Sequence, residues 1–134
     1  MIKPAAILLA AALSAMPAWS SAAAPKLPAL EAQVHCALVF GKVAREQSQK
    51  VPRSERFPAM AGPGREFFVV TGARALDEKA VTIETIEAYY MGRFAVLEAS
   101  LAKAADPAVA LDREYAQCLP QFAQVAPKFT PVPR

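Results

Sequence analysis

Two cysteines constrain the fold of this 134-residue chain more than any other feature. Cys36 and Cys118 are its only cysteines, and each lies on or beside the apolar face of a predicted helix. If the first and last helices pack side by side, the two sulfur atoms meet in the core. In the loop-entropy relation such a cross-link is worth about 4–5 kcal/mol, a large part of a domain's roughly 5–15 kcal/mol. We therefore expect a structural disulfide between Cys36 and Cys118.

A redox function for the same pair is the alternative. A thiol–disulfide redox protein would cycle Cys36 and Cys118 between the reduced and oxidised states. Such proteins usually hold a reactive, low-pKa thiol in a CxxC motif, and these cysteines are 82 positions apart in the sequence. The spacing favours the structural disulfide over the redox function.

The first 23 residues predict a signal peptide. Lys3 is basic, residues 4–15 are apolar, and residues 16–24 supply small side chains for cleavage near residues 22–24. The apolar run is too short for a membrane-spanning helix, and Pro17 interrupts it. We expect the protein in the periplasm or outside the cell, where disulfides form and persist.

Residues 24–126 are long enough for one helical domain, and no later stretch predicts an integral membrane segment after signal cleavage. Residues 127–134 are a proline-rich tail that we expect to lie extended on the surface. Beyond the signal peptide, 14 Lys and Arg face 12 Asp and Glu, a surplus of two. This balance does not indicate a nucleic-acid partner.

Prolines and apolar periodicity predict an all-α fold, a small bundle of about four helices pinned by one disulfide. The first helix spans residues 28–49, with a polar stripe on one side that comprises Glu31, His35, Lys42, Glu46 and Gln49. A loop over residues 50–62 leads to a second helix opened by Pro63. Its run Phe67–Val70 could equally be a short buried strand; helix is favoured because no partner strand is visible.

The third and fourth helices carry the clearest signals. Thr82 is the expected N-cap of the third, whose apolar stripe comprises Ile83, Ile86, Tyr90, Phe94, Leu97 and Leu101. Asp106 followed by Pro107 predicts the start of the fourth. Its stripe comprises Leu111, Tyr115, Cys118 and Phe122, and Pro120 is expected to bend or end it.

His35, the only histidine, raises the question of a reactive or metal-binding pair with Cys36. Neighbouring side chains on a helix point about 100° apart, so the two cannot converge on one ligand. A metal site needs three or four convergent ligands, and the chain has no second histidine. We expect His35 on the water-facing stripe near Glu31, and no metal or cofactor.

No catalytic motif is visible, and the other polar groupings have ordinary structural explanations. Glu84 and Glu87 could hold a divalent ion but are typical of a solvated helix face, and residues 62–66 could bind an anion but are typical of a turn. A basic segment could touch acidic envelope surfaces, although a solvated loop is favoured; it contains Lys42, Arg45, Lys50, Arg53 and Arg56. The aromatic side chains could line an apolar pocket, but helical spacing places most of them in the core.

The combination of a signal peptide with "CALVFGKVAREQ", "GREFFVVTGARALDE" and "AQCLPQF" resembles a group of small exported two-cysteine helical proteins of alphaproteobacteria. The resemblance is one of layout over most of the mature chain. It implies an all-helical fold with the two cysteines paired, and no assigned activity.

These observations together predict a non-enzymatic binding or structural accessory protein of the bacterial envelope. Its expected partner is an envelope protein or a small apolar ligand, through residues that the sequence does not identify. An enzyme that uses Glu84, Glu87 and His35 is the least favoured class, because no motif brings them together.

Overall fold

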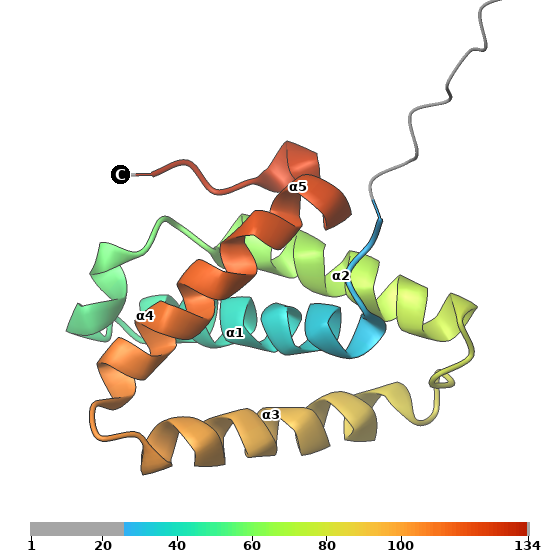
Figure 1. Cartoon of the computed structure of the whole chain (residues 1–134), viewed down its shortest axis with the longest axis horizontal. Coiled ribbons are helices and arrows are strands. Elements are labelled where there is room, and N and C mark those ends of the chain that lie inside the picture. Colours follow the sequence, from blue (N-terminus) through green and yellow to red (C-terminus); the bar gives the residue numbers. More distant parts are fainter. Residues whose placement is uncertain (1–25, 134) are drawn as a thin grey trace, which may run out of the picture.

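The computed structural model describes residues 26–133 and confirms an all-α bundle (Figure 1). The predicted signal peptide lies outside the described residues. The four long helices are α1 (Leu30–Ser48), α2 (Ala61–Asp77), α3 (Ile86–Lys103) and α4 (Pro107–Cys118), and α5 (Phe122–Val125) is a single turn. None of the helices within residues 26–133 is long and apolar enough to cross a membrane.

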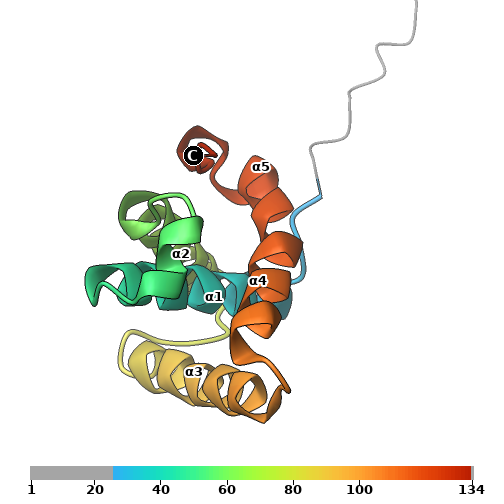
Figure 2. The same cartoon turned by 90° about the vertical axis from the view of Figure 1, so that its left-hand side faces the viewer.

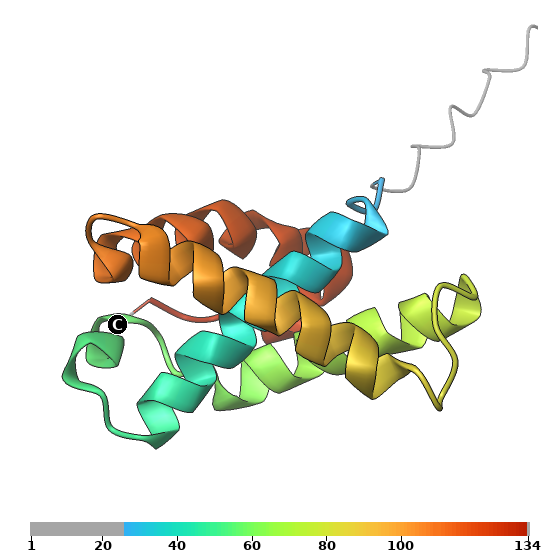
Figure 3. The ribbon, with the colours of Figure 1, turned by 90° about the horizontal axis from the view of Figure 1, so that it is seen from below.

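Helix α1 is the centre of the bundle. It contacts α2, α3 and α4, and the views from the end and from below show these helices on different sides of it (Figures 2 and 3). This position explains the unbroken apolar run of α1, because Cys36–Phe40 is buried without interruption. Glu46, which we expected on the solvent-facing stripe, is also buried.

Aromatic side chains fill the core around α1. The ring centroid of Phe40 lies 4.9 Å from that of Phe67 on α2 and 4.7 Å from that of Phe122 on α5. Tyr115 on α4 packs between Phe40 and Phe57, with ring centroids 5.9 and 4.7 Å away. Edge-to-face and tilted contacts of this kind add to the hydrophobic gain of burying the rings.

The long connection between α1 and α2 is ordered by one side chain. It contains the 3₁₀ turn η1 (Pro52–Arg56). The Gln47 amide nitrogen donates to the carbonyl oxygens of Ser54, Phe57 and Pro58, and its oxygen accepts a bond from the backbone N–H of Met60. Helix α2 then begins at Ala61, two residues before Pro63. The run Phe67–Val70 is helical, which settles the alternative between helix and strand.

The predicted start of the third helix is wrong by one turn. Thr82 and Thr85 close a hydrogen-bonded turn, in which the Thr82 N–H donates to the Thr85 hydroxyl oxygen at 2.9 Å, and α3 begins only at Ile86. Ile83, predicted in the apolar stripe, lies in this turn and is 78% exposed. Tyr90, Leu97 and Leu101 are buried as expected.

The expected boundaries of the fourth helix are confirmed. The Asp106 carboxylate accepts bonds from the backbone N–H groups of Ala108 and Val109, as an N-cap does. The helix ends at Cys118, and Pro120 lies in the 3₁₀ turn that follows. The tail is less extended than expected, because Pro127–Phe129 form another 3₁₀ turn against α2 and Pro131 is buried.

Candidate functional site

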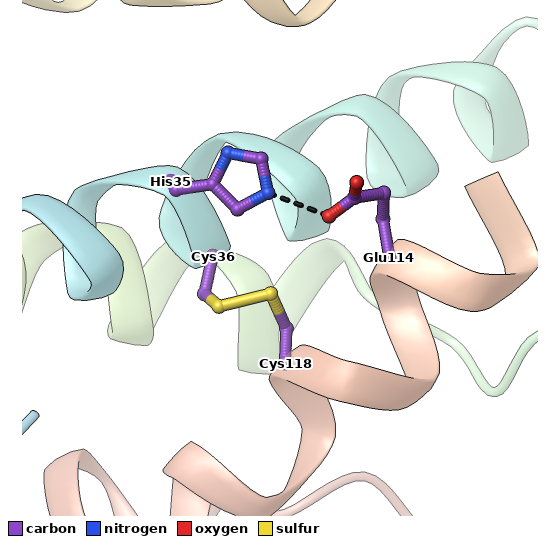
Figure 4. Close-up of a disulfide and its surroundings, with 4 residues drawn as sticks. All are labelled: His35, Cys36, Glu114 and Cys118. Carbon is purple, nitrogen blue, oxygen red and sulfur yellow. Dashed lines mark hydrogen bonds and ion pairs between the residues drawn. A yellow bond between two sulfur atoms is a disulfide. The ribbon is translucent and has the colours of Figure 1, made fainter. Parts of the chain in front are cut away.

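The disulfide between Cys36 and Cys118 joins the middle of α1 to the end of α4 (Figure 4). The Cα atoms are 5.2 Å apart, and both cysteines are buried. The predicted pairing is therefore present. Exchange with an external thiol needs access to a sulfur atom, and burial limits that access. The arrangement is that of a structural cross-link.

We expected His35 to face water, but its side chain also contacts α4. Its Nε2 lies 2.7 Å from the Glu114 Oε2 on α4, and its side chain is 43% exposed. Figure 4 shows the ring directed toward Glu114 while the side chain of Cys36 points to Cys118. Neighbouring residues of α1 thus make two separate links to α4, one polar and one covalent.

Glu31, the expected neighbour of His35, instead pairs with α3. The Arg93 guanidinium donates to both Glu31 carboxylate oxygens, at 2.7 and 3.0 Å, and lies 3.5 Å from the centroid of the Tyr89 ring. The hydrogen bond from Arg93 holds the pKa of Glu31 below its usual value. This pair is not predictable from the sequence, because helical spacing does not show which helix a side chain faces.

The basic segment is exposed to solvent, as expected, at Arg45, Lys50, Arg53 and Arg56, but three of its cations also form ion pairs within the fold. Arg53 donates to the buried Glu46 carboxylate at 2.8 Å, and Lys42 bridges Glu46 and Glu98 at 3.4 and 2.9 Å. Burial alone would raise the pKa of Glu46, but Arg53 and Lys42 outweigh it and lower the pKa. Arg56 similarly pairs with a carboxylate of α4. These cations are used within the fold.

A buried polar network, which we did not predict from the sequence, links α1 to α2. The Gln33 amide donates to the Thr71 hydroxyl at 2.9 Å, and Arg74 donates to the Gln33 oxygen at 2.7 Å and to the Pro28 carbonyl at 2.6 Å. Buried amides and hydroxyls need such partners. A helical wheel could have revealed Gln33, since it shares the face of Cys36, Ala37 and Phe40.

The expected acidic pair forms no metal centre. Glu84 lies in the exposed turn before α3, and Glu87 lies in the first turn of the helix. Within residues 26–133 no cluster of three or more His, Cys, Asp or Glu side chains could hold a metal ion. His35 pairs with Glu114 and not with either of these two glutamates.

An apolar groove opens between α2 and α3. Of the run Phe67–Val70, only Phe67 enters the core, and Phe68 stacks on Tyr90 of α3 with ring centroids 4.2 Å apart. Beside this pair lies a hollow of about 340 Å³, lined by Phe68, Ile86, Glu87, Tyr90 and Met91. Met91 is 66% exposed, so the groove presents apolar surface to the outside.

Side chains of α3 reach the backbone of α2 beside the groove. A Cβ atom on Gly72 of α2 would lie 3.5 Å from both Ile86 Cδ1 and the Tyr90 hydroxyl oxygen. Burial raises the pKa of Tyr90 to about 12, so its hydroxyl stays neutral at physiological pH. That hydroxyl donates a long bond, 3.5 Å, to the Phe68 carbonyl oxygen. The floor of the groove therefore carries no charge.

The largest hollow on the described part of the chain, about 420 Å³, is lined by Leu27, Gln33, Val70, Ala73, Arg74, Asp77, Glu78 and Val125. Two smaller hollows also contain charged residues. One, of about 240 Å³ between α1 and α3, is lined by Glu31, His35, Leu38, Arg93, Val96, Leu97 and Ser100. The other, of about 390 Å³, surrounds the Glu46 cluster. Charged side chains line all three, and several of them are paired, as Arg93 is with Glu31 and Arg74 is with Glu78. The groove between α2 and α3 has a mostly apolar lining, so it is the best candidate for a site that binds an apolar ligand. In comparisons with known proteins, no family model, no curated protein and no solved structure matches this chain.

Proposed function

We propose that this chain is an exported, non-enzymatic binding protein of the bacterial envelope, and that it binds a small apolar ligand in the groove between α2 and α3. The disulfide acts in this proposal as the structural cross-link that holds α4 on α1. The resemblance in layout to small exported two-cysteine helical proteins agrees with it.

The observation that carries the proposal is the exposed apolar lining of the groove. Phe68 and Met91 remain partly open to solvent although the neighbouring Phe67 is fully buried. A volume of about 340 Å³ lies in the range of small-molecule sites, which are mostly apolar with few polar groups. Ligand binding removes such side chains from water, which stabilises the complex by about 25 cal/mol for each Å² of apolar surface buried.

The binding test uses a fluorescent apolar probe, N-phenyl-1-naphthylamine, and the folded protein without its signal peptide. Saturable enhancement of probe fluorescence is expected, and the double variant Phe68→Ser/Met91→Ser should weaken it at least tenfold. Val96→Ser/Val132→Ser is the matched control, because both valines are exposed and neither lines the groove. Equal losses in the two double variants would refute a site in the groove.

Export is tested separately. The full chain is expressed in a Gram-negative host, and the protein in the periplasmic fraction is examined by N-terminal sequencing. The expected first residue of the mature protein lies between residues 23 and 25. Accumulation of the intact chain in the cytoplasm would contradict the signal peptide without bearing on the groove.

A further inference from the structure

We infer that the ligand of the groove is a cationic amphiphile, an apolar chain or ring with a positively charged nitrogen. The chain would lie on Phe68, Ile86 and Met91, and the nitrogen would sit at the Glu87 carboxylate on the rim. This inference rests on the proposed function and adds to it the charge of the ligand.

Among residues 26–133, Glu87 is the only charged residue that lines the groove. Its carboxylate makes no hydrogen bond or ion pair within residues 26–133. Other carboxylates close to the helix contacts are paired, as Glu31 is with Arg93 and Glu114 is with His35. Glu87 is thus an available negative charge at the edge of an apolar hollow.

The connection that leads from the end of α2 into the start of α3 is acidic although the chain as a whole carries a net charge of +3. The segment from Arg74 to Glu87 contains four carboxylates, Asp77, Glu78, Glu84 and Glu87, against two cations, Arg74 and Lys79. Figure 1 shows the turn between α2 and α3 at one end of the molecule and the connection that contains η1 at the other. Arg53 and Arg56 of the η1 connection therefore lie at the other end of the molecule from this acidic connection.

The N-terminus of α3 works in the opposite direction, because a helix start carries about half a positive charge. Glu87 lies in the first turn, so its full negative charge exceeds that half charge. Glu84, three residues earlier and exposed, adds to the negative side. The sum favours a cationic head group over a carboxylate at this rim.

The experiment compares three ligands with the same ten-carbon chain: decylamine, 1-decanol and decanoate. Decylamine and decanoate are kept below their critical micelle concentrations, and 1-decanol is kept below its solubility limit. Dissociation constants are measured by titration calorimetry at pH 7 and low salt on the chain without its signal peptide. Decylamine should bind roughly two- to fivefold tighter than decanol, the range of an exposed ion pair, and decanoate should bind more weakly than decanol. The preference for decylamine should shrink with added salt.

Glu87→Gln is the test variant, and Glu84→Gln is the matched control outside the groove lining. Glu87→Gln should bring the decylamine and decanol constants within a factor of about 1.5 and leave decanol binding unchanged, whereas Glu84→Gln should keep most of the preference. A tighter complex with decanoate, or an unchanged preference in Glu87→Gln, would overturn the inference while leaving an apolar site in place. If none of the three ligands binds, or if Phe68→Ser/Met91→Ser leaves decanol binding unchanged, the proposed function itself fails.

Discussion

His35 and Glu114 form a polar link between α1 and α4 directly beside the disulfide. Each is close in sequence to a cysteine: His35 precedes Cys36, and Glu114 lies one helical turn before Cys118. The Nε2–Oε2 distance of 2.7 Å was not visible from helical spacing, which placed His35 toward Glu31. The two links together fix the crossing of these helices.

The disulfide should make a large contribution to the free energy of unfolding of the domain. We expect Cys36→Ala/Cys118→Ala to lower the free energy of unfolding by about 2–5 kcal/mol, because the unfolded chain loses the constraint of a long loop. Urea unfolding followed by circular dichroism measures this change. If the double variant instead unfolds at the same urea concentration as the parent, the cross-link has no structural role.

The same bond should resist reduction in the folded protein, because both cysteines are buried. Intact-mass spectrometry after treatment with a mild thiol reductant should find the oxidised protein until urea is added. Ready reduction without denaturant would instead favour the redox protein that cycles Cys36 and Cys118.

The pair of His35 and Glu114 should contribute much less to the free energy of unfolding than the disulfide does. Both side chains are partly exposed, so we expect a coupling of about 0.2–1 kcal/mol between them. A double-mutant cycle with His35→Gln and Glu114→Gln isolates it from the effect of each single change. A coupling above 2 kcal/mol would show that solvent does not screen this contact.

Glu46 should make the free energy of unfolding depend on pH in the acidic range. Its pKa in the folded state lies below the ordinary value of 4.5, so its contribution is complete above that pH and is lost as the pH falls through the folded-state value. We expect Glu46→Gln to cost about 1–3 kcal/mol at pH 7, with a difference from the parent that narrows below pH 4.5. Urea unfolding at a series of pH values checks this, with Glu87→Gln as an exposed control. A constant difference down to pH 2 would contradict the assignment.

Adjacent phenylalanines should respond very differently to truncation. Phe67 is fully buried between Phe40 and Phe122, and Phe67→Ala should cost about 3–5 kcal/mol. Phe68 is 37% exposed, and Phe68→Ala should cost about 0.5–1.5 kcal/mol through the lost stacking on Tyr90. Urea unfolding of the two variants gives the comparison. Equal losses would mean that the outer side of α2 is covered in solution.

Local signals predicted the helices well. The Asp106 cap, the end of α4 before Pro120 and the buried positions of α3 depend on contacts within a few residues, which the sequence contains. The predicted start of α3 lies one turn too early, because Thr82 and Thr85 are both plausible caps. The hydrogen bond between them closes a separate turn before the helix. Spacing alone does not rank two such candidates.

The sequence by itself determined the all-helical class and the facing of the two cysteines, because periodicity tells which residues share one side of a helix. Only the tertiary structure decided that α1 is surrounded by three helices, so that Gln33 and Glu46 are buried and need polar partners from α2 and η1. It also decided that Phe68 borders an open groove while Phe67 does not. The physical reason is that the neighbour covering a helix face comes from distant parts of the chain, and only the packing of the whole core selects it.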